Sequence, residues 1–504
     1  MSNPFMKNNQ PVKKYIRLYD GLKQERASWA EVWKELSAYE APARGCFETD
    51  APNSARRINH KILLDSSAGL AAEVLSSGMM SGLTSPARSW FDLTVVPAEL
   101  GSLPEVSAWL HAVKRRVEET LAKSNVYGAL HGFYQEIAVF GTAALLLEED
   151  FVSGVHARLF TAGEYVLGTD GHGVINTFGR EFFLTAKQLE NTFGYDKLPL
   201  SLQQEAKQDT TRYHKVFHLI LPNENYGRAN RSNAHFAYES VYFLQDDTLL
   251  RSGGYYEFPV IAARWEVKND CDAYGRGPGW KCLGDVKMLQ KIQKAKLVAL
   301  DKNTNPPVMV SSNVQGEVNL LPGGITRYNG TTDAAVKPAY TVTPDLDALD
   351  RAIEQVRGMI KAHFFADVFT LLNTQDTPQM TAAEVAERRE EKMTVLGPVL
   401  ERLKNELLDP LVRRVFHILV RQGEILPAPL FVRGHNIQVE YISMIAQAQK
   451  AAGLSSLLQG AQLANELSVA DPSLRGHFNY RRVLTEGLEK LGLSHLVSIE
   501  NQLQ

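Results

Sequence analysis

Hydrophobic side chains recur at every third or fourth position along residues 15–39, which predicts an amphipathic helix with Trp29 and Trp33 on its apolar face. Similar spacing predicts helices over residues 58–80, 105–123 and 126–139. From Thr142 to Val267 the pattern changes to short alternating or β-rich runs separated by Gly, Asp and Asn. Strands are predicted at 142–147, 155–160, 213–221, 236–244 and 255–265, with a turn at 168–173 and a helical insert at 185–208. The pattern predicts an α+β fold with a mostly antiparallel sheet.

The next part of the chain pairs two helices around a short insert. A glycine-rich corner at residues 274–280 precedes a predicted helix over 283–300, and Lys287, Lys291 and Lys294 fall on one face of it. Residues 303–343 then carry few charges and many Val, Thr, Pro and Gly residues, which predicts short strands and turns. Acidic residues open another helix that runs to about residue 367. Two helices therefore bracket a small β insert.

A polar segment follows the second of these helices. Its turn-forming residues are Asn373, Thr374, Gln375, Asp376, Thr377, Pro378 and Gln379. Thr381 and Glu384 have the spacing of a capping box, which predicts a new helix at Thr381. Gly397 and Pro398 lie within that helix and predict a kink. By pattern alone, two ordinary helices joined by a polar turn account equally well for this segment. After a break at 423–429, the remaining residues are predicted to be helical at 441–454, 457–467 and 480–491.

Length, composition and charge limit the classes of function. The chain has 504 residues, of which 44% are hydrophobic and 22% charged, as in soluble proteins of about three domains. No apolar run approaches the roughly 18 residues that cross a bilayer, and residues 1–14 lack a signal-peptide core. Three scattered cysteines fit neither a disulfide framework nor a zinc site, which indicates a reducing compartment. A net charge of −3 argues against tight DNA binding but allows a conduit for DNA.

No segment predicts catalysis, and we expect no catalytic, cofactor or metal site. The chain contains no Gly-Lys dipeptide for a phosphate-binding loop, and Gly275, Gly277 and Gly279 lack dinucleotide-binding spacing. His214 and His218 lie on a predicted strand without further ligands at suitable spacing. Asp345, Asp347 and Asp350 are more typical of a helix start than of a cation site.

Three segments carry a resemblance to a known family: residues 56–93, residues 274–302, and residues 367–421 with their polar loop, capping box and Gly-Pro pair. Together they resemble the head-to-tail connector (portal) proteins of short-tailed bacteriophages, and the resemblance weakens after about residue 430. It implies a wing at 1–278, stem helices at 279–302 and 344–367, and a clip at 303–343. It further implies a channel loop and kinked wing helix at 368–422 and a helical crown at 423–504.

The resemblance also implies a function: a ring of about twelve subunits at one capsid vertex of the virion, assembled in the bacterial cytoplasm, through which DNA is packaged and ejected. Expected partners are the terminase large subunit, a tail adaptor, the major capsid and scaffold proteins, and double-stranded DNA in transient contact, with no membrane and no cofactor. The loop at 373–379 would face DNA. Lys287, Lys291 and Lys294 would face DNA, or would lie on a solvated face or pair with acidic residues of a neighbouring subunit.

The clip would dock partners through Val308, Val310, Glu317, Arg327 and Lys337.

Two alternatives to the portal function remain. Another virion structural protein, such as an adaptor or scaffold, is the nearer one, although adaptors are usually shorter and scaffolds usually lack a large sheet. A DNA-processing enzyme would need a carboxylate cluster near a basic surface, and the sequence offers none.

Overall fold

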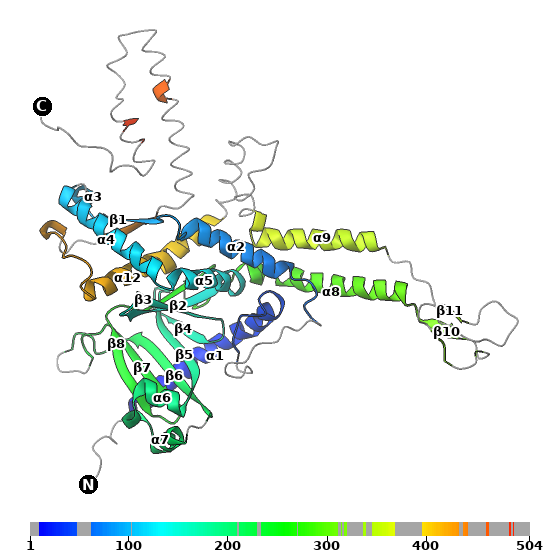
Figure 1. Ribbon diagram of the computed structural model, residues 1–504, viewed down its shortest axis with the longest axis horizontal. Helices are drawn as coiled ribbons and strands as arrows, with labels where there is room; N and C mark the ends of the chain where they lie inside the picture. The colour runs from blue at the N-terminus through cyan, green and yellow to red at the C-terminus, as the bar shows by residue number, and fades with distance from the viewer. Residues whose placement is uncertain are drawn as a thin grey trace, which may run out of the picture.

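The computed structural model describes residues 10–47, 62–101, 103–208, 211–228, 233–269, 271–310, 314, 317–319, 336–338, 345–367, 396–432, 437–441, 460–462, 483–484 and 487. These residues form a body of helices and sheets from which two long helices project (Figure 1). The body and its projection together are a mixed α+β structure, as the sequence pattern predicts.

Two antiparallel sheets form the β part of the body. The first has the order β4-β5-β6-β7-β8, and the second has the order β3-β2-β9. The strands are β2 (Thr142–Asp150), β3 (Gly154–Phe160), β4 (Tyr165–Thr169), β5 (Ile175–Thr185), β6 (Tyr213–Pro222), β7 (Tyr238–Leu244), β8 (Leu249–Tyr255) and β9 (Val260–Arg264). Every pairing within these two sheets is antiparallel, which confirms the prediction.

One strand prediction is wrong. The β-rich run at 255–265 divides between two sheets, because β8 ends at Tyr255 and β9 begins at Val260. Between them, the Pro259 carbonyl oxygen accepts a hydrogen bond from the Leu147 amide at 2.9 Å, which ties the connection to β2. Side-chain propensity favours β structure on both sides of this connection. The sequence pattern therefore predicts one continuous strand, although β8 and β9 pair with different strands.

Helices pack around the sheets. They are α1 (Gln10–Tyr39), α2 (Ser67–Leu83), α3 (Ala98–Gly101), α4 (Pro104–Lys123), α5 (Val126–Phe140), α6 (Ala186–Phe193), α7 (Leu200–Lys207) and α12 (Asp409–Arg421). Helices α2, α4, α5 and α12 lie on one side of the three-stranded sheet, and α1 runs along the five-stranded sheet (Figure 1). Of the predicted helix at 58–80, residues 58–61 lie outside the described residues and the helix begins at Ser67: residues 62–66 are not helical, and the Leu64 and Asp65 amides donate hydrogen bonds to the Gln290 side chain.

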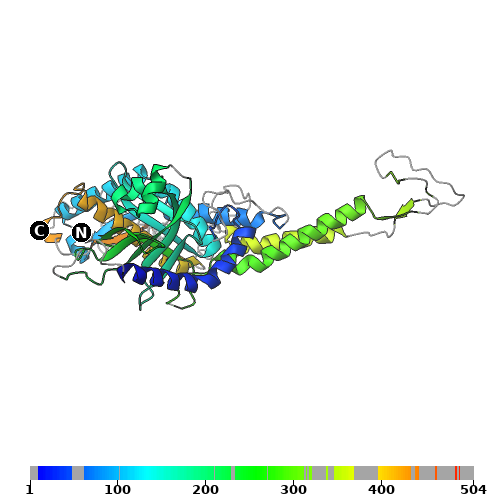
Figure 2. The same ribbon diagram turned by 90° about the horizontal axis from the view of Figure 1, so that it is seen from below.

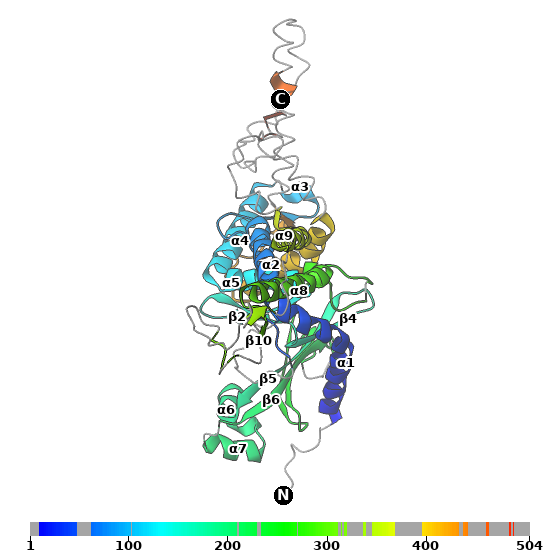
Figure 3. The same cartoon turned by 90° about the vertical axis from the view of Figure 1, so that its right-hand side faces the viewer.

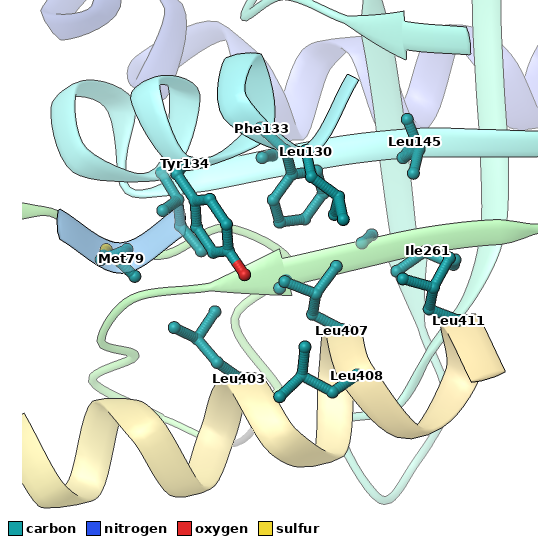
Figure 4. Close-up of a cluster of buried hydrophobic side chains, with 14 of the residues drawn as sticks. Met79, Leu130, Phe133, Tyr134, Leu145, Ile261, Leu403, Leu407, Leu408 and Leu411 are labelled. Atoms are coloured by element: carbon teal, nitrogen blue, oxygen red, sulfur yellow. The ribbon is translucent and has the colours of Figure 1, made fainter. Parts of the chain in front are cut away.

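The core joins segments that are far apart in the chain. Leu403, Leu407, Leu408 and Leu411 pack beneath Phe133 and Tyr134 of α5 and Ile261 of β9 (Figure 4). Residues Lys404–Leu408 form a π-helical turn directly before α12. The extra residue in such a turn rotates the helix, and here both Leu407 and Leu408 are buried in consecutive positions. The C-terminal helix thereby becomes part of the body.

The projection consists of α8 (Pro278–Thr304) and α9 (Leu346–His363). They run side by side away from the body, and β10 (Val308–Val310) and β11 (Val336–Pro338) lie near their far end (Figure 2). Figure 3 looks along this pair. The 27 residues of α8 extend about 40 Å. Two helices around a small β insert are therefore confirmed, although α8 begins before the predicted residue 283.

A further strand was not predicted. β12 (Ile437–Tyr441) pairs antiparallel with β1 (Phe91–Val95), so that Phe91 lies opposite Tyr441. The segment falls within the part assigned to a helical crown, and its last residue, Tyr441, was predicted to start a helix. Its alternating exposure, with Gln438 and Glu440 outward, is the period of a half-buried strand. The other predicted crown helices lie outside the described residues, apart from 460–462, 483–484 and 487.

Candidate functional site

The corner at residues 274–280 is closely packed. A Cβ at Gly277 would lie 2.7 Å from the Ile137 carbonyl oxygen, and one at Gly279 would lie 2.7 Å from the Val139 carbonyl oxygen. Gly141, at the end of α5, lies on the other side of this contact. Its φ is +79°, and a Cβ added to it would lie 2.3 Å from the Gly277 nitrogen. The glycines are required because two backbones cross here. They form the base of α8, and a structural corner is the correct interpretation of their spacing.

Ion pairs and apolar contacts hold α8 and α9 together. His363 Nε2 lies 3.4 Å from Asp285 at the body end, and Lys296 pairs with Asp350 further out, so the two helices are antiparallel. Between these pairs α9 buries Ile353, Val356 and Ile360. Asp345 caps α9, because its side chain accepts a hydrogen bond from the Ala348 amide at 2.9 Å. Asp345 therefore caps the start of α9, and Asp350 pairs α9 with α8.

Asp65 connects the body to both projecting helices. Its carboxylate accepts hydrogen bonds from Arg357 of α9 at 2.7 Å and from Gln293 of α8 at 2.9 Å. Burial raises the pKa of Asp65, but bonds from Ser67, Arg357 and Gln293 outweigh it and lower the pKa below the ordinary value. Gln290 adds two bonds, since its Oε1 accepts from the Asp65 amide and its Nε2 donates to the Asp65 carbonyl. No sequence motif signals this cluster, because Asp65 lies more than 200 positions from Gln290, Gln293 and Arg357.

The three lysines of the α8 stripe have different surroundings. Lys287 pairs with Glu35 of α1 at 2.8 Å and lies over the Tyr39 ring, so its contacts join α8 to the body of the same subunit. Lys291 and Lys294 are exposed, and within the described part of the chain neither forms an ion pair. The stripe is therefore divided into one internally paired lysine and two that face outward.

The tip of the projection presents apolar side chains. β10 and β11 pair with Val308 opposite Pro338 and Val310 opposite Val336. Met309 and Val310 are 48% and 45% exposed. Of the other residues expected to dock partners, Glu317 is exposed and Lys337 lies in β11 opposite Met309, whereas Arg327 lies outside the described residues. The described tip is thus a short antiparallel pair of strands with exposed apolar side chains on both of its faces.

The expected channel loop lies outside the described residues. This applies to Asn373, Thr374, Gln375, Asp376, Thr377, Pro378 and Gln379, and to the capping box at Thr381 and Glu384. Gly397 and Pro398 are described, and residues 396–403 are helical around them. The irregularity that the described residues show in this helix is the π-helical turn at Lys404–Leu408, a few residues further on.

The described ionisable groups form structural contacts. The His214 ring lies 2.7 Å from Glu205, whereas the fully buried His218 stacks on Tyr242 and bonds to Ser240. Burial, with the charge of Arg180, holds the pKa of His218 well below its ordinary value. Among the described residues no group of three His, Cys, Asp or Glu side chains is placed to hold a metal ion. None of the described helices has the length and apolar character needed to span a bilayer.

Arginine–carboxylate pairs join distant elements of the body. Glu406, presented by the π-helical turn, accepts from the Arg264 guanidinium at 2.6 Å and from the Arg264 amide at 2.8 Å. The buried Arg44–Glu136 pair, at 3.0 Å, links the segment after α1 to α5. Each such charge has a counterion and adjoins packed side chains, which is what buried charges require.

Comparisons with known proteins agree with the sequence resemblance. Residues 12–496 match the family described as bacteriophage head to tail connecting protein. The chain is 39% identical to a probable portal protein of Bordetella phage BPP-1, over 86% of this chain and 79% of that protein. It is 36% identical to the portal protein of Salmonella phage epsilon15, over 95% of this chain and 87% of that protein.

A solved structure, the neck of an empty gene transfer agent particle, aligns with a TM-score of 0.42 and 10% identity, over 85% of this chain and 94% of that one.

Proposed function

Because the chain belongs to the bacteriophage head-to-tail connecting protein family and is a portal protein of the virion head–tail junction, we propose that its subunits close into a ring of about twelve copies around a DNA channel. Proteins of this family are structural components of the virion and not enzymes. The observation that carries the proposal is the family match over residues 12–496.

The layout that we propose for the ring follows the resemblance. Residues 1–278 form the wing, α8 and α9 form the stem, and residues 303–343 form the clip at its end. Residues 368–422 hold the channel loop and the wing helix, and the crown follows. The projection of α8 and α9 with β10 and β11 at its far end (Figure 1) supports the stem and clip. The pairing of β12 with β1 favours a crown that begins after Tyr441 and not at 423.

Uncovered apolar side chains on the stem support assembly. Leu297 and Val298 of α8 are 53% and 45% exposed, next to Lys296, which pairs with Asp350 of α9. Exposed apolar surface of this kind is usually covered by a partner. In a closed ring, one face of each subunit contacts a different face of the next. The neighbouring subunit is the partner that we propose for this surface.

The oligomeric state tests this proposal. Native mass spectrometry should show one closed oligomer near twelve copies, and negative-stain microscopy should show rings. Replacing Leu297 and Val298 by Lys should shift the mass toward monomers, because the charges would be buried at the interface. Leu200→Lys on the exposed surface of α7 is the matched control and should leave the rings intact. A stable monomer or dimer of the wild-type chain at micromolar concentration would refute the ring.

We propose that residues 373–379 contact DNA in the channel. The segment carries Asp376 as its one charge, so its contact with phosphates is weak and lets DNA slide. Deletion of Asn373–Gln379 should leave ring assembly intact and reduce the DNA packaged or retained. If rings with the deletion package and hold full-length DNA like the wild type, the loop has no channel role.

A further inference from the structure

A buried carboxyl group lies where the stem meets the wing. Glu40 directly follows α1 and is 2% exposed. Its Oε1 accepts a weak hydrogen bond from the Cys282 thiol of α8, with a distance of 3.8 Å between the sulfur and the oxygen. Its Oε2 is buried and has no hydrogen-bond partner among the described residues. A buried ionised oxygen without a partner carries a large desolvation cost.

Four elements enclose this group closely. A Cβ at Gly279, in the first turn of α8, would lie 2.3 Å from Glu40 Oε2 and 2.7 Å from the Val139 carbonyl oxygen of α5. A Cβ at Gly69 of α2 would lie 3.0 Å from the Glu40 carbonyl oxygen. The carboxyl group is thus enclosed between the end of α1, α5 and the first turn of α8, while α2 packs against the Glu40 backbone, which leaves little room for water.

The charged groups on these elements do not neutralise Glu40. Each is either exposed or engaged with another residue: Arg44 with Glu136, Lys281 with Glu266, Lys287 with Glu35, Asp285 with His363, Asp65 with Arg357, and Glu73 of α2 exposed. The titratable group in contact is Cys282, whose own pKa is raised by burial and by the nearby Glu40 and Asp285. Among the described residues, no cation therefore stabilises an ionised Glu40.

We propose that Glu40 binds a proton at neutral pH and that this proton keeps the base of the stem helix α8 closed against the wing. Release of the proton places an uncompensated charge among α1, α2, α5 and α8 and favours their separation. Glu40 lies at the corner from which α8 projects, so the proton concentration would control the stability of the junction between the stem and the wing.

The sign of the effect follows from linkage. Burial raises the pKa of Glu40 to about 8 in the folded chain, whereas an exposed glutamate titrates near 4.3. The closed junction is therefore most stable below the exposed value and loses stability as the pH rises toward about 8. Between these two values the opening equilibrium should increase toward tenfold per pH unit, and it should level off above about pH 8.

Infrared difference spectroscopy on the full chain tests the proton directly. At pH 7 the wild type should show the carbonyl band of a protonated carboxyl group that Glu40→Gln lacks. The band should disappear as the pH rises through about 8. Glu73→Gln, which removes an exposed carboxylate on α2, should leave this band unchanged. If the wild type and Glu40→Gln give the same band region at pH 7, the proposal is overturned.

Hydrogen exchange tests the consequence. The ratio of wild-type to Glu40→Gln exchange in the first turns of α8 should rise with pH between about 5 and 8, because the intrinsic rates cancel in the ratio. Glu40→Leu, which also cannot ionise, should behave like Glu40→Gln. If the ratio of wild-type to variant exchange does not change with pH for either Glu40→Gln or Glu40→Leu, the proposed effect of the Glu40 proton on the base of α8 is overturned, even if the infrared band is present. These readouts concern the subunit, so their outcome is separate from that of the ring and channel proposals.

Discussion

At the scale of single residues, Glu257 shows how this protein uses buried charge. It lies between β8 and β9, where Arg421 of α12 donates to it at 3.0 Å and Arg414 also pairs with it. Burial alone would raise the pKa of Glu257, but His417, Arg421 and Arg414 lower it to about 2. The carboxylate therefore stabilises the folded chain only while it is ionised.

We predict that the contacts of Glu257 with Arg414 and Arg421 make the stability of the folded chain sensitive to acid. A lowered folded pKa contributes stability that is present above the unfolded value, near 4.3, and is lost as the pH falls through about 2. At pH 7, Glu257→Gln should lower the free energy of unfolding by about 2–3 kcal/mol. The difference from the wild type should shrink as the pH falls from about 4.5 to about 2.

Urea unfolding at a series of pH values measures this difference. Glu31→Gln on the exposed face of α1 is the control and should have little effect at any pH. A constant difference between wild type and Glu257→Gln down to pH 2 would contradict the predicted titration.

At the scale of elements, the α8–α9 pair, which we assign to the stem, is anchored to the body at its base. Asp65, Gln290 and Arg357 fix the α8–α9 pair to the segment before α2. Beyond this cluster, Lys291 and Lys294 extend from α8 into solvent. Exposed lysines contribute little to subunit stability, and we propose that Lys291 and Lys294 act in contacts with DNA or with another subunit.

Charge reversal distinguishes these two contacts. If Lys291 and Lys294 face the channel, replacing both by Glu should leave rings intact and reduce packaged DNA, more at low salt than at high salt, because salt screens the repulsion. Lys268→Glu, on an exposed part of the body, is the control. Ring assembly is checked by electron microscopy and DNA by a packaging assay. Rings that fail to assemble would instead place the two lysines at a subunit interface.

At the scale of the whole molecule, the body and the strands β10 and β11, which we assign to a wing and a clip, are far apart and joined by α8 and α9 (Figure 2). The body holds its own extensive core, to which α5, β2 and α12 contribute buried side chains. The described part of the clip has exposed apolar side chains at Met309 and Val310 and pairs only β10 with β11. The two ends should therefore respond independently to mutation.

We predict that the clip can be removed without unfolding the wing. Replacing residues 303–343 by a short Gly-Ser linker between Lys302 and Pro344 should preserve the circular dichroism and thermal unfolding of the wing but abolish binding of the terminase large subunit. A pull-down measures that binding. The double variant Met309→Ser and Val310→Ser is a milder test of the same surface and should weaken binding. Unchanged terminase affinity after replacement would contradict the docking role.

The sequence by itself determined the α+β class, most of the long helices and the family. Local patterns specify these features, because helical and strand spacing, caps and glycine corners act between residues close in the chain. The helix at Pro104–Lys123 and the start of β2 at Thr142 fall within a residue of their predictions. The cap at Asp345 is likewise a local interaction and was predictable.

Only the tertiary structure decided which distant residues meet. The start of α2 at Ser67 depends on Gln290, and the division of 255–265 into two strands depends on the partners of each strand. β12 finds its partner about 350 positions earlier, at β1, and Glu40 becomes a buried acid only because Gly279 of α8 closes over it. Burial and hydrogen bonding between segments set these outcomes, and a local pattern does not encode which segments will be brought together.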